Sequence, residues 1–490
     1  MSFDLVLFGG TGDLTWRKLM PALFQAFRHG KLPADGRILA VARDERSDDD
    51  YRAYIHERFA EVEADKRPNE EEFGNFAKLL HYRRMDLSKP EDYAGLKRWL
   101  DEPTAEEGRS NGRADSAVLF LATSPHLFPV ICQQLGHAGL NGDHVRVVLE
   151  KPLGHDLASA KEINRAVSEA FSESQALRLD HYLGKPAVQN LMALRFGNAL
   201  FEPLWRRESI ASIQITLAER IGVGSRGDFY NRTGALRDMI QNHALQLLTM
   251  IAMEPPSTSD ADAIRDEKLK VLRSLKPFTP ESVARDVVRG QYKAGTMDGQ
   301  PVAGYLDEVK VPAGSTCETF VALRTEVQNW RWAGVPFYLR TGKRLAARDA
   351  HIVVTFREVP HPIFPGTRQA NKLVIKLQPE DGLELHLLAA KSGGGNEVLS
   401  PVSLDLDFDK AFPTERVGGY ERLLMDALAG RLNLFVRSDE QEQAWRWVEP
   451  VLEAWAKDPT GPRNYAPGSW GPAAASALVA RDGCTWAEEQ

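Results

Sequence analysis

The stretch DLVLFGGTGDL at residues 4–14 decides the fold of this chain. An apolar run that ends in glycines predicts a buried strand, followed by a tight turn and a helix. Glycines let the backbone approach a pyrophosphate, and the helix N-terminus offers free N–H donors. The usual GxGxxG spacing is incomplete, because Thr15 follows where the third glycine is expected. The position of the turn still predicts dinucleotide binding, with a plain strand–helix turn as the alternative.

Strands and helices alternate over the first 180 residues. Continuous apolar runs predict parallel strands that are covered on both faces, at residues 37–42, 116–123 and 144–151. An amphipathic stretch begins at Ser47 with Asp50 three residues later, as in a capping box. Pro21 predicts a kink or a short first segment in the first helix. Residues 1–180 are therefore predicted to form an α/β Rossmann-like domain with a parallel sheet.

The pattern changes after about residue 180, where strand-like runs follow one another. They lie at residues 209–219, 316–327, 352–357, 372–378, 383–388 and 403–409. Several alternate apolar and polar residues, which is typical of an antiparallel sheet with one wet face. Helices are expected at about 234–253, 419–431 and 438–456. Residues 181–490 are therefore predicted to form an α+β domain with a large, mainly antiparallel sheet that binds substrate and mediates oligomerisation.

Composition narrows the class of protein. The net charge of −7 argues against a nucleic-acid partner, and the apolar runs are too short to span a bilayer. The N-terminus enters a strand without a basic segment before it. The cysteines are far apart, at positions 132, 317 and 484, which fits neither a disulfide framework nor a metal-ligand spacing. We expect a cytoplasmic protein without a metal site or a membrane partner.

The octapeptide RLDHYLGK at residues 178–185 gathers chemically useful side chains. A carboxylate, an imidazole, a phenol and an ammonium lie within one strand-to-turn stretch. Cationic donors and a hydroxyl suit a phosphate, and a carboxylate can orient a base or accept from hydroxyls. The pattern predicts a site for a phosphorylated, hydroxyl-rich substrate, and the alternative is a polar turn after a strand.

A second polar cluster, RDMIQNH at residues 237–243, opens a helix that continues with apolar residues. Asp238 and Asn242 are four positions apart and are expected on one helix face. His243 is a candidate base for oxidising an alcohol, because the pKa of histidine lies near working pH. Either Asp180 or Asp238 could orient its ring. The alternative is a buried histidine with a structural role.

Two further positions lie at predicted strand ends. Lys151, in EKPLG at residues 150–154, is placed to reach both nicotinamide and substrate, since ligands bind beyond the carboxyl ends of parallel strands. The alternative is a surface lysine before a turn. Arg43 follows the second strand and favours NADP, because arginine accommodates a 2′-phosphate. Asp44 keeps NAD possible as a secondary cofactor, since a carboxylate there accepts from the ribose hydroxyl.

Taken together, these motifs resemble the glucose-6-phosphate dehydrogenase family, and the bacterial enzymes most. The resemblance covers nearly the whole chain and rests on residues 9–14, 150–152, 178–185, 237–243 and 329–343, in this order. It implies an oxidoreductase that acts on a CH–OH group in the pentose phosphate pathway. The implied reaction oxidises β-D-glucose 6-phosphate at C1 to 6-phospho-D-glucono-1,5-lactone, with hydride passing to NADP⁺.

The resemblance also implies roles for single residues. His243 is the implied general base and Asp180 the carboxylate that orients it. The substrate-binding residues that it implies are Lys151, His181, Tyr182, Lys185, Glu219, Asp238, Lys343 and Arg348. The implied cofactor-binding residues are Gly9, Thr11, Gly12, Asp13, Leu14, Arg43, Ser124, Pro125 and Lys151. Within these sets, His181, Tyr182 and Lys185 hold the phosphate.

Departures and alternatives accompany the resemblance. Arg348 stands where some members carry lysine, which keeps the charge and changes the geometry. Trp16 occupies a position that is more often small or basic, and we have no physical account of it. The family precedent predicts a homodimer or homotetramer. The alternative functions are another Rossmann-type sugar or inositol oxidoreductase and a non-catalytic nucleotide-sensing protein.

Overall fold

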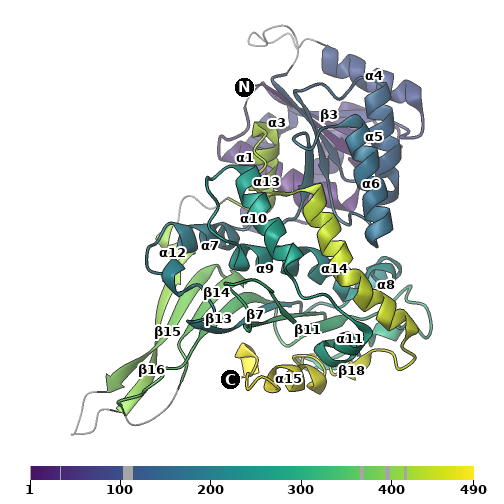
Figure 1. The fold of residues 1–490 in the computed structure, drawn as a ribbon. Coiled ribbons are helices and arrows are strands. Elements are labelled where there is room, and N and C mark those ends of the chain that lie inside the picture. The colour runs from purple at the N-terminus through teal and green to yellow at the C-terminus, as the bar shows by residue number, and fades with distance from the viewer. Residues whose placement is uncertain are drawn as a thin grey trace. The chain divides into compact units, whose positions relative to one another are not determined.

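The computed structural model describes residues 2–33, 35–102, 114–364, 369–391, 398–412 and 417–489 (Figure 1). The chain forms two compact units. The first comprises Met1–Gly184, Thr258–Arg265 and Val417–Glu442, and the second comprises Lys185–Ser257, Asp266–Arg416 and Gln443–Gln490. Within the described ranges, every helix is too short or too polar to cross a membrane.

A seven-stranded sheet forms the centre of the first unit. Its strands are β1 (Phe3–Phe8), β2 (Arg37–Ala42), β3 (Leu80–Arg84), β4 (Ser116–Leu121), β5 (Val145–Leu149), β6 (Ala176–Leu179) and β17 (Phe435–Val436). The order is β17-β6-β5-β4-β1-β2-β3, and all pairs are parallel except β17 with β6. Residues of β1 and β4 are buried along their whole length, as their apolar runs predict. The predicted Rossmann-like domain is confirmed.

Helices cover this sheet: α1 (Met20–Arg28), α2 (Asp48–Phe59), α3 (Glu70–Ala77), α4 (Pro90–Asp101), α5 (Phe128–His137), α6 (Leu157–Ala170) and α13 (Gly419–Ala429). The capping box of α2 is confirmed, since the Ser47 hydroxyl accepts from the Asp50 N–H at 3.1 Å. Pro21 lies in the first turn of α1, directly after the π-helical segment η1 (Thr15–Leu19). The Met20 N–H donates to the Thr15 carbonyl five residues back, so the helix passes from η1 into α1 beside the proline.

The second unit is built on a nine-stranded sheet in the order β16-β15-β14-β13-β7-β12-β11-β8-β18. Its strands are β7 (Ile210–Ala218), β8 (Val287–Tyr292), β11 (Phe320–Glu326), β12 (Pro336–Gly342), β13 (Asp349–Phe356), β14 (Lys372–Gln378), β15 (Gly382–Lys391), β16 (Val398–Asp407) and β18 (Arg463–Tyr465). Only β7 with β12 and β8 with β18 pair in parallel among these neighbours. The predicted, mainly antiparallel sheet is confirmed, and a small β9–β10 hairpin (Gly295–Met297, Gln300–Val302) accompanies it.

The helices of the second unit are α7 (Pro186–Phe196), α8 (Gly227–Ala235), the π-helical η6 (Leu236–Ala244), α9 (Leu245–Ala252), α11 (Pro280–Asp286), α12 (Phe408–Ala411) and α15 (Ala473–Ala480). Helices α10 (Ala261–Arg273) and α14 (Ser438–Lys457) contain residues of both units. Short 3-10 turns are η2 (Ala64–Lys66), η3 (Pro125–Leu127), η4 (Glu202–Leu204), η5 (Gly224–Arg226), η7 (Tyr305–Asp307) and η8 (Ala487–Glu489). Figure 1 shows α9 on one face of the large sheet and α15 on the other.

Candidate active site

The glycine turn after β1 is a close-packed cradle. Gly9 adopts a φ of 85°, and a Cβ there would lie 2.7 Å from the carbonyl oxygen of Ala122. A Cβ on Gly10 would lie 2.5 Å from the Cβ of Ala40. The amides of Gly9 and Gly10 both donate to the carbonyl of Val41, at 3.0 and 2.9 Å. Only glycine fits these positions, which is the requirement of a turn that receives a dinucleotide pyrophosphate.

Helix α2 holds this turn from outside. The hydroxyl of Tyr51 donates to the carbonyl of Gly10 at 2.8 Å, and that of Tyr54 donates to the carbonyl of Thr11 at 3.3 Å. The Thr11 hydroxyl donates to Asp44 at 3.4 Å. The end of β2 and the glycine turn are therefore linked by hydrogen bonds, so that side chains of both could contact the same nucleotide.

The predicted residues of the first unit follow the ends of neighbouring parallel strands. The glycine turn follows β1, Arg43 follows β2, Ser124 and Pro125 follow β4, Lys151 follows β5, and Asp180 follows β6. Strand β1 lies between β4 and β2, so the strand order reverses at the glycine turn. In open α/β sheets, ligands bind beyond the strand carboxyl ends at this reversal.

Sequence reasoning missed a shallow depression beside the second strand end. It has a volume of about 580 Å³ and is lined by Asp44, Glu45, Arg46, Asp50, Ala53, Tyr54 and Glu57. The Arg46 guanidinium lies 4.8 Å from the centre of the Tyr54 ring, a cation–π geometry. The sequence did not indicate this depression, because Arg46 lies among acidic residues and such a charged run is most often a solvated surface.

Glu150, which precedes Lys151, is a buried carboxyl with 7% exposure. Burial raises its pKa to about 8, although the Lys151 ammonium opposes the shift, and the charge of Asp180 adds to it. The Tyr420 hydroxyl donates to Glu150 at 3.5 Å. The Tyr420 ring stacks on His181 with centroids 5.9 Å apart and planes 12° apart. Tyr420 belongs to α13, far from the octapeptide in the sequence, so its contact with His181 could not be predicted from the sequence.

The octapeptide turns sharply after β6. Asp180 accepts from the backbone N–H of Tyr182 at 2.9 Å, and its carbonyl accepts from that of Leu183 at 3.0 Å. His181 lies beside the Tyr182 ring, with centroids 5.0 Å apart. The turn thus fixes the backbone that carries the predicted phosphate ligands of the first unit.

In the second unit, the structure brings Lys343 and Glu219 together. Glu219 follows β7 and Lys343 follows β12, and these strands are neighbours. Lys343 Nζ lies 2.5 Å from Glu219 Oε2, and only 4% of the Lys343 side chain is exposed. The ammonium also lies 5.0 Å from the centre of the Tyr230 ring. An ammonium and a carboxylate presented together can bind vicinal sugar hydroxyls as donor and acceptor.

The helix that carries Asp238 and His243 is π-helical from Leu236 to Ala244. Residues four apart still lie close to one full turn apart in the i→i+5 pattern of a π-helix, so Asp238 and Asn242 keep to one face, and both are partly exposed. Asn242 accepts from the backbone N–H of His243 at 2.6 Å. Such segments are frequent at functional sites.

Glu318 and Gly234 set the start of this helix, and sequence reasoning missed both. Gly234 has a φ of 69°, and a Cβ there would meet the Glu318 carboxylate at 2.3 Å. Glu318 accepts from the backbone N–H of Leu236 at 3.0 Å, and burial raises its pKa. A buried carboxyl thus caps the helix at its positive end.

The predicted site residues divide between the two units. Asp180, His181 and Tyr182 lie in the first, whereas Lys185, Asp238 and His243 lie in the second. Lys185 Nζ donates to the Leu377 carbonyl at 3.5 Å, and Arg348 is exposed immediately before β13. The pairing of His243 with Asp180 stays a prediction.

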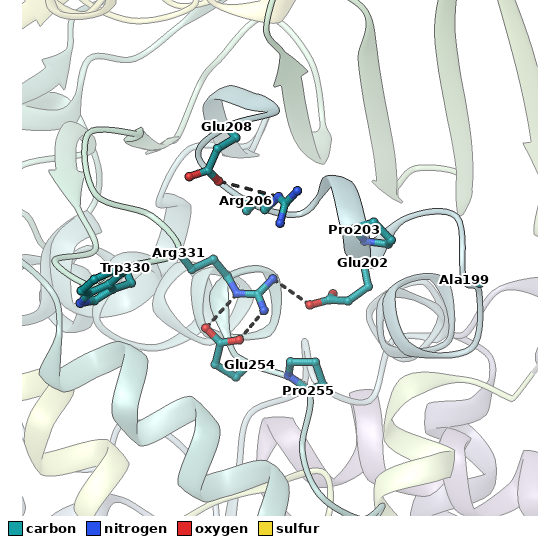
Figure 2. A pocket seen from close by; sticks show the side chains of 9 residues that line it. All are labelled: Ala199, Glu202, Pro203, Arg206, Glu208, Glu254, Pro255, Trp330 and Arg331. Atoms are coloured by element: carbon teal, nitrogen blue, oxygen red, sulfur yellow. Dashed lines mark hydrogen bonds and ion pairs between the residues drawn. The ribbon is translucent and has the colours of Figure 1, made fainter.

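Figure 2 shows a separate pocket of about 690 Å³ in the second unit. Arg331 donates to Glu254 and lies 2.7 Å from Glu202, and Arg206 lies 3.8 Å from Glu208. Among the residues that the structure describes, the lining includes none of the predicted site residues. Both arginines are paired with carboxylates, so we assign the pocket no part in the candidate active site.

These features define a nicotinamide dinucleotide-dependent oxidoreductase. They are the Rossmann-like sheet, the glycine turn at the reversal of its strand order, and the Glu219–Lys343 pair of the second unit, which suits sugar hydroxyls. Comparison with known proteins then identifies the particular family. Residues 6–190 match the family described as "Glucose-6-phosphate dehydrogenase, NAD binding domain", and residues 192–487 match "Glucose-6-phosphate dehydrogenase, C-terminal domain". The chain belongs to the glucose-6-phosphate dehydrogenase family, which confirms the resemblance seen in its sequence motifs.

Relatives agree over the full length. The chain is 46% identical to a glucose-6-phosphate 1-dehydrogenase of Rhizobium meliloti over 487 residues, covering 99% of this chain and 97% of that protein. It is 47% identical to that of Mycolicibacterium smegmatis over 486 residues, again covering 99% and 97%.

Two solved structures share the architecture. One is a glucose-6-phosphate dehydrogenase in complex with glucose 6-phosphate, with a TM-score of 0.88 and 32% identity, covering 99% of this chain and 98% of that one. The other is a glucose-6-phosphate 1-dehydrogenase of Mycobacterium avium, with a TM-score of 0.83, 36% identity and 99% coverage of both chains.

Proposed function

We propose that this chain oxidises β-D-glucose 6-phosphate at C1 to 6-phospho-D-glucono-1,5-lactone, with hydride transfer to NADP⁺. The observation that carries the proposal is the full-length match to a solved family member that holds glucose 6-phosphate. Its TM-score of 0.88 extends over both units, so the likeness covers the nucleotide end and the sugar end. This reaction is the entry step of the oxidative pentose phosphate pathway.

His243 acts as the general base. Its imidazole takes the proton of the C1 hydroxyl while the bound nicotinamide accepts the hydride. Asp180 orients the imidazole and stabilises its protonated form. His243 is fully buried, which limits competing protonation by solvent. We therefore assign the base to the π-helical segment and its positioning carboxylate to the octapeptide.

The substrate roles follow from charge. His181, Tyr182 and Lys185 hold the phosphate, because cationic donors and a hydroxyl make charge-assisted bonds to its oxygens. Lys151 contacts the sugar near C1. Glu219, Asp238 and Lys343 meet the sugar hydroxyls, and Arg348 adds a further positive charge. The 2.5 Å contact between Lys343 and Glu219 supports a preformed polar platform.

NADP is the proposed cofactor, with NAD as a secondary one. Gly9, Thr11, Gly12, Asp13 and Leu14 receive the pyrophosphate, with Ser124, Pro125 and Lys151 nearby in the same unit. Arg43 supplies a positive charge after β2 for the 2′-phosphate. Asp44, which accepts from Thr11 at 3.4 Å, is also placed to accept from a ribose hydroxyl, which supports use of NAD.

A homodimer or homotetramer is the proposed assembly. Strand β16 forms one edge of the nine-stranded sheet, and its residues Val398, Val402, Leu404 and Leu406 are 42–61% exposed. They occupy alternate positions and therefore share one face. Exposed apolar faces of this kind mark interaction surfaces, and edge strands need cover. A second copy of the chain is the proposed cover.

Purified protein with NADP⁺ or NAD⁺ and either glucose 6-phosphate, free glucose or inositol tests the function through nicotinamide reduction. Reduction with inositol alone would favour the sugar or inositol oxidoreductase alternative, and nucleotide binding without turnover would favour the sensor. His243→Asn should lower the turnover number by roughly 10²–10⁴, the usual range for general base catalysis, while glucose 6-phosphate still binds. A near-normal turnover number would exclude His243 as the base.

A further inference from the structure

A buried ionic cluster on the large sheet involves none of the proposed catalytic or ligand-binding groups. Arg340 on β12 and His351 on β13 both contact Glu488 in η8. The Arg340 side chain is fully buried, and 9% of the Glu488 side chain is exposed. His351 Nε2 lies 3.0 Å from Glu488 Oε1, and its Nδ1 lies 3.0 Å from Asp349.

These contacts form one row across the centre of the sheet. Arg340 is the register partner of Thr216 on β7, and Thr216 is that of His351. Directly opposed residues point to the same face, and so does Gln214, two positions before Thr216. This row therefore presents its side chains to the segment at residues 485–488.

The segment at residues 485–488 is fixed to that face at several points. Gln214 donates to the Thr485 carbonyl at 2.8 Å and accepts from the Ala487 N–H at 3.1 Å. The fully buried Trp486 donates to the Ala475 carbonyl at 3.0 Å. The centre of its ring lies 4.1 Å from the guanidinium carbon of Arg340. Glu488 thus supplies the negative charge that the buried guanidinium needs, because an uncompensated buried charge is strongly destabilising.

The row lies next to the proposed sugar platform. Glu219 lies three residues after Thr216, just past the end of β7, and Lys343 lies three residues after Arg340, just past the end of β12. The Glu219 N–H donates to the Gly342 carbonyl at 2.9 Å, so the two strand ends move together. Displacement of β12 relative to β7 would change the 2.5 Å contact between Lys343 and Glu219.

We propose that residues 485–488 are a latch that positions the Glu219–Lys343 pair for the sugar, with Glu488 as the anchoring carboxylate. Glu488, Arg340 and His351 are positioning residues, since they act through β7, β12 and β13. A metal ion is not required to explain the cluster, because Arg340 and the imidazolium of His351 already neutralise Glu488 and Asp349. The inference rests on the proposed sugar-binding role of Glu219 and Lys343.

The test compares Glu488→Gln, which keeps the shape and removes the charge, with Glu488→Asp, which keeps the charge. The exposed Glu453→Gln on α14 is the matched control. We expect Glu488→Gln to raise the KM for glucose 6-phosphate by roughly three- to tenfold, the range for one hydrogen bond, with a smaller change in kcat. It should also speed hydrogen exchange of the Ala487 N–H, which donates to Gln214. Glu488→Asp should recover most of both properties, and the control should match the wild type.

Several results would overturn the latch. An unchanged KM in Glu488→Gln would do so, as would a raised KM without faster hydrogen exchange at Ala487, or an equal defect in Glu488→Asp. If Glu488→Gln does not fold, His351→Gln provides the same test, because it removes one of the two cations that hold Glu488. Failure of the proposed function is distinguishable: Glu219→Gln would then leave the KM for glucose 6-phosphate unchanged, whereas a defect in Glu219→Gln beside a normal Glu488→Gln would sink only the latch.

Discussion

Replacement of Glu150 by glutamine should stabilise the protein, by an amount that grows with pH. The Glu150 carboxyl is 7% exposed, and burial raises its pKa from 4.5 to about 8. Between these values the unfolded chain is ionised while the folded protein keeps the proton. Stability is therefore lost as pH rises from 4.5 towards 8. Glutamine resembles the neutral acid in shape and does not titrate, so the variant escapes this loss.

The size of the effect follows from the shift. One pKa unit corresponds to about 1.4 kcal/mol, so ionisation of Glu150 costs the wild type about 4 kcal/mol at pH 8 and less than about 1 kcal/mol at pH 5. The advantage of Glu150→Gln should thus widen by about 3 kcal/mol over this range.

Guanidinium unfolding at pH 5, 6, 7 and 8 measures the difference through the denaturation midpoints at equal slopes. The exposed Glu162→Gln on α6 is the control and should track the wild type at every pH. Infrared spectroscopy should detect a protonated carboxyl in the wild type at neutral pH that is missing in Glu150→Gln. Parallel stability curves for the wild type and Glu150→Gln would refute the reasoning.

Other expected outcomes concern substrate, pH and assembly. Lys185→Ala should raise the Kd for glucose 6-phosphate by roughly ten- to a hundredfold through loss of a charge-assisted bond, and an unchanged Kd from calorimetry would contradict its role. Burial lowers the pKa of His351, but Asp349 and Glu488 outweigh it and raise the pKa to about 9. The protonated His351 should therefore contribute about 3 kcal/mol to the free energy of unfolding below pH 6.5, and this contribution should be lost as pH rises through 9. Thermal unfolding of the wild type beside His351→Gln measures it. Leu404→Glu should lower the mass found by light scattering, and an unchanged mass would argue against β16 as the interface.

Local patterns predicted much of the fold because they act over short stretches. The run at residues 37–42 coincides with β2, and that at 372–378 coincides with β14. Strand β12 escaped because its sequence, PFYLRTG, begins with proline and is buried on both faces, so it lacks alternation. The helix at 419–431 was predicted, but only the structure shows Tyr420 against His181.

The candidate site was predictable where chemistry is dense in the sequence. The octapeptide and Lys151 could be recognised from the sequence, because several polar groups gather at the end of an apolar run. Glu318 did not, since its role depends on the backbone of Gly234, a residue 84 positions earlier in the chain. The π-helical start of the base-bearing helix also escaped, because no sequence period distinguishes it from an α-helix.

The first unit is built from separate stretches of the chain, which has a consequence for folding during synthesis. Strand β17 completes the edge beside β6, and α13 packs on α1 and β4, although both come from residues beyond 417. A ribosome must therefore release nearly the whole chain before the nucleotide-binding sheet acquires its last strand. Until then the edge of β6 is open to wrong partners, which is a hazard for edge strands. A fragment that stops at residue 184 should accordingly be prone to aggregation, and the two units are poor candidates for exchange between family members as separate blocks.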